Sequence, residues 1–171
     1  VEVNSENLFD ELTSKYLSVI RQFNNIDQNK LNQLIKQIKN TKNIYIIGVH
    51  YSSLPAKHLV LGLQDLGINT YFAYDYMQAS HLYNTIHEDD LLIYFSIEGN
   101  QNNVSRFFDL TNASKNTYII TLNPKPKLLI ENTLILPGYT LSKQSIVDLQ
   151  SIVVIFVELL LNMFHNTLKE D

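Results

Sequence analysis

The sequence of 171 residues contains no cysteine, which excludes disulfide bonds, thiolate zinc sites and cysteine nucleophiles. It also has no cluster of lysine or arginine, and its formal net charge is −4. A surface that binds nucleic acid needs such a cluster, so we do not expect this segment by itself to bind DNA or RNA. The lack of cysteine is consistent with a reducing cytoplasm, where we expect the protein to be.

No signal peptide is visible, because residues 1–21 carry acidic residues early and have no long apolar core. The most apolar stretch, residues 146–164, is interrupted by five polar residues: Asp148, Gln150, Ser151, Glu158 and Asn162. We therefore predict a buried helix over about residues 143–165 and no membrane partner. A helix that is apolar nearly all round must be covered on more than one side, so we also expect a homodimer or a higher homo-oligomer.

Size and composition indicate one globular domain, with 45% hydrophobic and 18% charged residues. Two amphipathic helices are expected in residues 1–42, packed on an α/β domain in residues 43–171. Asp27 is the expected N-cap of the second helix. The apolar residues recur at helical spacing: Leu8, Leu12, Tyr16, Val19 and Phe23 in the first helix, and Leu31, Leu34, Ile35 and Ile38 in the second.

Short apolar runs bounded by turns are predicted to be strands, at residues 44–47, 69–73, 91–95, 117–122 and 133–136. Helical patterns lie between most of them, including a helix after residue 100 that carries Val104, Phe107 and Phe108. Strands that alternate with helices indicate βαβ units. We therefore predict a three-layer α/β/α sandwich with a five-stranded parallel sheet, of flavodoxin or Rossmann type, with extra N-terminal helices.

Two polar loops follow predicted strands, at residues 48–53 (GVHYSS) and 96–101 (SIEGNQ). In parallel sheets ligands bind beyond the carboxyl ends of the strands, so both loops should lie at a ligand-binding edge. Backbone N–H groups and the positive end of the following helix favour a ligand with negative charge or many acceptors. Without a ligand, each loop would be an ordinary turn between a strand and a helix.

The two loops supply the candidate binding residues. Gly99 allows the backbone to turn tightly or to approach a ligand closely. His50 can donate to a ligand or act as an acid or base, although a loop histidine is more often simply exposed. The five histidines show no metal-ligand spacing with carboxylates, so we expect no metal. We expect a pocket between the loops that is lined by hydroxyl, amide, glycine, carboxylate and imidazole groups: Ser52, Ser53, Ser96, Asn100, Gln101, Gly99, Glu98 and His50.

Both loops resemble those of the sugar isomerase (SIS) domain. The segments IYIIGVHYSSLPAKHL and DDLLIYFSIEGNQNNV carry the resemblance. The first loop of the family reads approximately Gly-x-Gly-x-Ser, which Gly48 and Ser52 match. The second reads approximately Ser-x-Ser-Gly-x-Thr, which Ser96 and Gly99 match. In the family, loop hydroxyls and backbone N–H groups hold a sugar phosphate, so the resemblance implies a phosphosugar site in these loops.

Within this family, the sequence is most similar to the effector half of RpiR-type transcriptional regulators. The segment Tyr51-Ser52-Ser53-Leu54, the two leading helices and the long final helix all fit. The resemblance implies a ligand-sensing domain, not an enzyme, that binds a carbohydrate derivative without a cofactor or catalytic residues. Such regulators contact DNA through an N-terminal helix-turn-helix domain. This chain lacks that domain and does not start with methionine, so we expect a truncated protein.

Three positions depart from the family pattern. His50 stands where a second glycine would be, Glu98 replaces the second serine of the second loop, and Gln101 replaces the threonine. A carboxylate about 4 Å from a phosphate charge would be repelled by about 4 kcal/mol at an effective dielectric near 20, which offsets several hydrogen bonds of about 1 kcal/mol each. Alternatively, Glu98 points to solvent, or it covers the N-terminus of the following helix and fills the anion site itself.

Two other functions are compatible with the sequence. An aldose–ketose phosphosugar isomerase needs a base to move a proton between adjacent carbons, and Glu98 or His50 could supply it. A degenerate SIS domain would be kept only as a dimerisation module. A helix-turn-helix encoded before Val1 in the native gene would favour the regulator, whereas a native start near Val1 would favour an enzyme or an isolated module.

Overall fold

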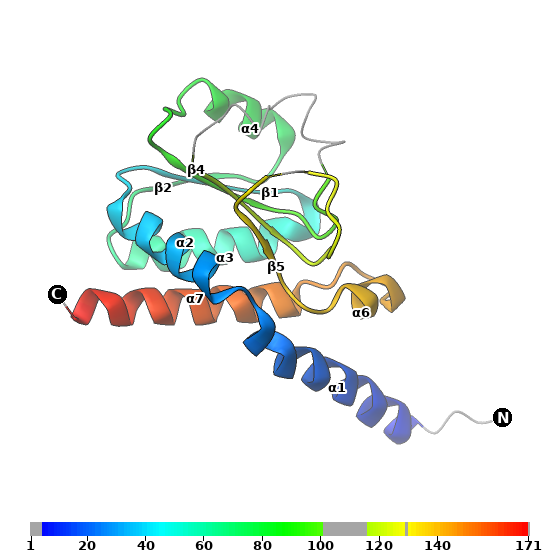
Figure 1. Ribbon diagram of the computed structural model, residues 1–171. Helices are drawn as coiled ribbons and strands as arrows, with labels where there is room; N and C mark the ends of the chain where they lie inside the picture. The colour runs from blue at the N-terminus through cyan, green and yellow to red at the C-terminus, as the bar shows by residue number, and fades with distance from the viewer. Residues whose placement is uncertain (1–4, 101–115, 129, 171) are drawn as a thin grey trace.

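The computed structural model describes residues 5–100, 116–128 and 130–170. Its centre is a sheet of five strands in the order β2-β1-β3-β4-β5, and all neighbouring strands are parallel (Figure 1). This confirms the predicted five-stranded parallel sheet, and each strand end lies within about one residue of its predicted position. The strands are β1 Ile44–Gly48, β2 Thr70–Ala73, β3 Leu91–Phe95, β4 Asn116–Thr121 and β5 Thr133–Ile135.

Helices cover both faces of the sheet, which confirms the three-layer sandwich. One face is covered by α2 (Gln28–Asn40), α3 (Ser53–Asp65) and α7 (Ser151–Lys169), and the other by α4 (Tyr76–Tyr83) (Figure 1). Every residue of β1 and β3 is buried, because these inner strands are covered from both sides. The two core clusters therefore lie above and below the same strands.

Side-chain caps fix where two of the helices begin. The Asp27 carboxylate accepts hydrogen bonds from the backbone N–H groups of Asn29 and Lys30 at 3.0 and 3.1 Å, which confirms Asp27 as the N-cap of α2. The Asp75 carboxylate accepts one from the Gln78 N–H at 2.8 Å at the start of α4. The helix expected after residue 100 lies outside the described residues.

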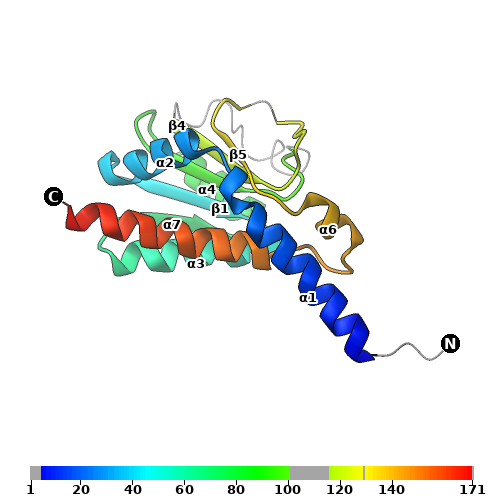
Figure 2. The same ribbon diagram turned by 60° about the horizontal axis from the view of Figure 1, so that its bottom comes forward.

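The first helix, α1 (Ser5–Arg21), extends away from the sheet and leads into the short 3-10 helix η1 (Gln22–Asn25) (Figure 2). Within the part of the chain that the structure describes, α1 buries Val19 alone, and Phe9 is 71% exposed. In contrast, α2 buries all the apolar residues predicted for it: Leu31, Leu34, Ile35 and Ile38. The described residues therefore leave most of the apolar face of α1 uncovered.

The single helix predicted over residues 143–165 is wrong in its first part, because the structure has two helices there. α6 (Tyr139–Gln144) ends before Ser145, which has an extended backbone conformation, and α7 begins after a further short segment. The N–H of Leu149 donates to the Ser142 hydroxyl at 3.4 Å across this break. Leu149, which lies in this segment, is buried in the core.

The last helix, α7, is long and apolar enough to cross a membrane by length and composition alone. In the structure it packs closely against α3, since a Cβ at Gly62 would overlap with the Leu161 side chain. The prediction of a buried helix is confirmed for this side, whereas Leu159 and Leu168 are exposed. The residues of α7 that join the core are Ile152, Val153, Phe156, Val157, Leu160 and Phe164.

Candidate functional site

The two predicted loops begin side by side at one edge of the sheet. β1 pairs with β2 on one side and with β3 on the other, so the strand order reverses between β1 and β3. Gly48 at the end of β1 pairs with Phe95 at the end of β3. The loops that follow them, residues 49–53 and 96–100, therefore start at the reversal point. This is where ligands bind in sheets with this strand order.

The first loop is a short 3-10 helix, η2 (His50–Ser52), that leads directly into α3. The N–H of Ser52 donates to the Val49 carbonyl at 3.1 Å, and the Ser53 hydroxyl donates to the His50 carbonyl at 2.5 Å. The Ser53 donor is thus already used inside the loop. The Ser52 hydroxyl makes no capping bond and has no partner among the described residues, so it is the hydroxyl of this loop that is open to a ligand.

Backbone geometry explains two residues of the first loop region. A Cβ at Gly48 would overlap with the Ser52 carbonyl oxygen and lie 2.7 Å from the Ala56 Cβ, so only glycine lets the loop fold back onto β1. His50 has φ 56°, in the left-handed region that favours glycine and that histidine enters at a cost. This is the position where the family pattern has glycine. The His50 ring is exposed and lies 4.5 Å from the Tyr51 ring, centroid to centroid.

The second loop closes on itself at Gly99. The Gly99 N–H donates to the carbonyl of Ser96 at 3.2 Å and to its hydroxyl oxygen at 3.1 Å. Gly99 has φ 59°, and a Cβ there would lie 2.6 Å from the Pro126 Cβ. The glycine is therefore required by a tight turn and by a close approach to Pro126, whether or not a ligand is present.

Hydrogen bonds from the end of β4 and the segment that follows it hold the second loop in place. The Ile97 carbonyl accepts from the Thr121 hydroxyl at 2.9 Å, the Glu98 carbonyl from the Asn123 side-chain amide at 2.9 Å, and the Gly99 carbonyl from the Leu128 N–H at 2.9 Å. Three successive loop carbonyls are thus satisfied from the β4 side. The loop is consequently fixed by residues that are distant in the sequence.

The Glu98 carboxylate contacts α6. One carboxylate oxygen accepts from the Tyr139 hydroxyl and the other from the Lys143 ammonium, each at 2.8 Å. Partial burial acts to raise the pKa of the Glu98 carboxyl group. The hydrogen bonds from Lys143 and Tyr139, together with the charges of Lys143 and Lys127, lower the pKa by more, so it lies below its ordinary value. The hydrogen bond to Glu98 likewise raises the pKa of Lys143. Glu98 is therefore a paired anion near neutral pH.

Tyr94, near the end of β3, is close to the second loop. Burial raises the pKa of its phenol to about 12, while a hydrogen bond with Ser96 acts in the opposite direction and is the smaller effect. Ser96 therefore interacts with both Tyr94 and the Gly99 N–H. Its hydroxyl group therefore stabilises the loop.

The structure brings together, at the β1–β3 edge, most of the residues predicted for the site. Asn100 is half-buried at the end of the described part of the loop, and Gln101 lies outside the described residues. Tyr139 and Lys143 were not predicted. They lie 41 and 45 residues from Glu98, and nothing in the sequence pairs them with it. The residues at this edge are His50, Ser52 and Ser53 from the first loop and Ser96, Glu98, Gly99 and Asn100 from the second.

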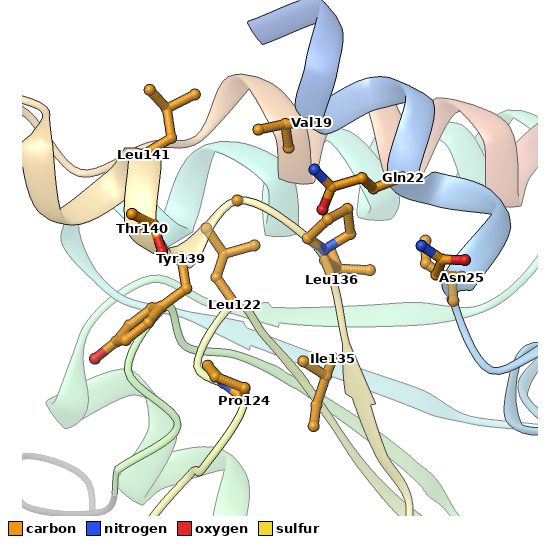
Figure 3. Close-up of a pocket in the computed structure, with 13 residues that line it drawn as sticks. Val19, Gln22, Asn25, Leu122, Pro124, Ile135, Leu136, Tyr139, Thr140 and Leu141 are labelled. Carbon is orange, nitrogen blue, oxygen red and sulfur yellow. The ribbon is translucent and has the colours of Figure 1, made fainter. Parts of the chain in front are cut away.

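A cavity of about 370 Å³ lies next to the second loop, between α1, η1, the end of β5 and α6 (Figure 3). Tyr139 forms part of its wall and contacts Glu98 through its hydroxyl group. The cavity does not lie between the two loops, so the pocket expected there stays a prediction. The lining is largely apolar, with the amides of Gln22 and Asn25 at one side: Val19, Ile26, Leu122, Pro124, Ile135, Leu136, Pro137, Gly138, Tyr139, Thr140 and Leu141.

Within residues 5–100, 116–128 and 130–170, no three histidine, aspartate or glutamate side chains are grouped so that they could hold a metal ion. The polar groups at the β1–β3 edge are instead hydroxyls, amides and backbone N–H groups. Such donors suit a ligand that is rich in oxygen atoms.

Comparison with known proteins gives matches at the level of structure. No family model matches the sequence, and no curated protein matches it. The NanR protein of Vibrio vulnificus, complexed with ManNAc-6P, superposes with a TM-score of 0.79 at 17% identity, over 97% of this chain and 66% of that one. This chain therefore spans about two thirds of the NanR chain.

Two further structures share the fold. The sugar isomerase domain of an RpiR transcription factor from Sphaerobacter thermophilus superposes with a TM-score of 0.71 at 16% identity, over 92% of this chain and 89% of that one. The protein MJ1247 of Methanococcus jannaschii, for which a 3-hexulose-6-phosphate isomerase function was inferred from its structure, superposes with a TM-score of 0.63 at 22% identity. The superposition covers 95% of this chain and 92% of that one. With its strand order, leading helices and paired loops, this chain has the fold of the sugar isomerase (SIS) domain.

Proposed function

We propose that this chain is the ligand-sensing domain of an RpiR-type transcriptional regulator of the cytoplasm, and that its ligand is a sugar phosphate. The observation that carries the proposal is the meeting of two polar loops at the strand-order reversal between β1 and β3. Two of the similar structures support it: the RpiR transcription factor and NanR with bound ManNAc-6P. DNA would be contacted by a separate helix-turn-helix domain.

The first loop offers the groups that an anionic ligand needs. α3 begins at Ser53, so the positive end of its dipole faces the loop edge, although the Ser53 N–H is already bonded within η2 and Pro55 has no N–H. The Ser52 hydroxyl is available to donate, and the Ser96 hydroxyl lies on the adjacent loop. Asn100 and Gln101 would add amide donors from the second loop. The phosphate would lie at the start of α3, with the sugar hydroxyls toward the second loop.

Calorimetric titration tests this proposal with a panel of hexose and amino-sugar phosphates that includes ManNAc-6P. We expect one of them to bind the wild type. Ser52→Ala should lower the affinity for that ligand about tenfold or more, because a hydrogen bond to a charged group contributes about 1.5–3 kcal/mol. Ser18→Ala, on the exposed surface of α1, is the matched control and should leave the affinity unchanged. Equal binding by wild type and Ser52→Ala would contradict this site.

The second candidate function is an aldose–ketose isomerase, which the similarity to MJ1247 favours. Its base would be His50 or Glu98, although Glu98 is already paired with Lys143. Incubation of the protein with each sugar phosphate in D₂O, followed by NMR, detects deuterium incorporated at the carbons next to the carbonyl group. Incorporation would establish an enzyme, and binding without incorporation would support a sensor. Binding of no sugar phosphate would favour a dimerisation module.

We also propose that the protein self-associates, at least to a dimer. On α1 the large side chain of Phe9 is exposed, and on α7 Leu159 and Leu168 are exposed, so two helices keep apolar surface that a partner subunit could cover. Sedimentation velocity at micromolar concentration should show a dimer, and Phe9→Ser should shift it toward monomer. Ser18→Ala, on the opposite face of α1, should not. A monomeric wild type would contradict the proposal.

A further inference from the structure

The Glu98 clasp, which we define as Glu98 with Tyr139 and Lys143, joins the second loop to α6. Both carboxylate oxygens are occupied, one by each donor at 2.8 Å. Tyr139 and Lys143 are four residues apart on α6, so both face the loop from the same side of this helix. The Lys143 ammonium also lies 5.0 Å from the centre of the Tyr139 ring, so the three groups form one cluster.

The clasp draws the carboxylate away from the first loop. In the sheet, β1 lies on one side of β3, whereas β4 and β5 lie on the other. The Glu98 side chain ends on α6, which follows β5, and its backbone carbonyl is bound by Asn123, which follows β4. In Figure 3 Tyr139 lies on the α6 side of the cavity. The carboxylate is thus directed toward the β5 side and not toward the β1–β3 edge.

The negative charge of Glu98 is balanced by positive charges as well as held away from the first loop. Lys143 pairs directly with Glu98, and Lys127 adds a further attractive positive charge. A phosphate at the β1–β3 edge would therefore meet a carboxylate that is already neutralised, which reduces the repulsion expected from the sequence alone. If the pairing were lost, the Glu98 side chain, which lies 41% exposed, would be free to adopt rotamers closer to that edge.

We infer that Tyr139 and Lys143 are specificity-determining residues: by holding the Glu98 carboxylate, they allow a loop with glutamate in place of serine to accept a sugar phosphate. This inference rests on the proposed function. The two residues act through Glu98 and do not touch the ligand, so they are positioning residues. Glu98 alone would exclude anionic ligands, whereas Glu98 in the clasp admits them.

A double-mutant cycle tests the inference, with ManNAc-6P and the other sugar phosphates as probes in calorimetry. Lys143→Met should lower the affinity for the sugar phosphate about tenfold, because it frees the Glu98 carboxylate. Glu98→Ser should bind at least as tightly as the wild type. The double variant Glu98→Ser with Lys143→Met should recover affinity to within about threefold of the wild type, because no carboxylate remains to repel the ligand.

Controls separate the clasp from general effects of charge. Lys125→Met removes an exposed lysine nearby that does not contact Glu98, and it should leave the affinity unchanged. Tyr139→Phe removes one hydrogen bond of the clasp and keeps the ring in place, so it should weaken binding by about twofold to threefold. Lys143 is 56% exposed, so its replacement should not prevent folding.

Each outcome of the cycle decides a different question. Lys143→Met with the affinity of the wild type would overturn the inference. The inference would also be overturned if Lys143→Met lost affinity and the double variant with Glu98→Ser did not regain it, because Lys143 would then contact the ligand itself. If only Glu98→Ser binds sugar phosphates, the clasp fails to neutralise Glu98 and the inference is wrong, while the phosphosugar site stands. If no variant binds any sugar phosphate, the proposed function fails together with the inference.

Discussion

The first loop, which follows β1, is held by contacts among its own residues, whereas the second, which follows β3, has one internal turn at Gly99 and is otherwise held by residues from β4 onward. In the first, Ser53 donates to His50 and Ser52 to Val49, all within the loop. In the second, the donors to the loop carbonyls come from the end of β4 and the segment after it, and the Glu98 carboxylate is bound by α6.

This difference bears on how each loop can change. A loop that is held by local bonds depends on its backbone conformation, so replacing its glycine should have the larger effect there. A loop that is held by distant residues depends on the docking of other elements. The position of the Glu98 carboxylate can therefore be changed from α6, which lies in a different part of the sequence. The four predictions below test this contrast, from the largest expected effect to the smallest.

Gly48→Ala should have the largest effect. The new Cβ would overlap with the Ser52 carbonyl oxygen, which is backbone and cannot rotate away. We expect the free energy of unfolding, measured with urea, to fall by about 3 kcal/mol, at the upper end for overpacking. Gly67→Ala is the control, since a Cβ there meets nothing within 4 Å. A cost for Gly48→Ala no larger than that of the control would show that the first loop is not fixed against β1.

Gly99→Ala should be the next most damaging change, and it tests the second loop. Its φ of 59° costs about 1 kcal/mol with alanine, and the contact at 2.6 Å with the Pro126 Cβ adds about 1 kcal/mol more. Gly67 also has a positive φ, of 79°, but open space around it, so Gly67→Ala isolates the conformational part. Equal costs at Gly99 and Gly67 would mean that Pro126 gives way.

His50→Gly should stabilise the protein. Glycine relieves about 1–2 kcal/mol of strain in the left-handed region, which stabilises the folded state. It also stabilises the unfolded state by about 0.5–1 kcal/mol through greater backbone entropy, so the free energy of unfolding should rise by only about 0.5 kcal/mol. His50→Ala keeps the strain and should give no such gain. Urea denaturation of the three proteins measures both effects. A loss of stability in His50→Gly would show that the imidazole makes a stabilising contact.

The pH dependence of the Glu98 clasp should give the smallest effect, because the pair is largely exposed to solvent. The pKa of Glu98 in the folded protein lies below its ordinary value of 4.5. Its stabilising contribution is therefore present above about pH 4.5 and is lost as the pH falls through the lower folded pKa. The stability difference between wild type and Glu98→Gln should thus be positive at pH 7 and shrink toward pH 3. A difference independent of pH would contradict the pairing.

The amino-acid sequence by itself determined the sheet and the edge at which the two polar loops begin. Strands such as residues 91–95 are apolar throughout because they are buried on both faces, and that pattern can be read without a structure. The turn at Gly99 and the cap at Asp27 are likewise local, since each bonds to residues within a few positions. Parallel pairing then places both loops at one edge, because carboxyl ends of parallel strands share it.

Only the tertiary structure decided what Glu98 does and where α7 begins. The sequence left Glu98 facing a ligand, solvent or a helix N-terminus, and the structure pairs it with Tyr139 and Lys143 instead. Those partners lie more than 40 residues away, and their contact depends on how α6 docks after β5. The break before α7 also involves contacts between distant segments, because Leu149, which lies in the break, is buried in the core. Contacts between distant segments leave no periodic signal in a sequence, so the folded chain alone reveals them.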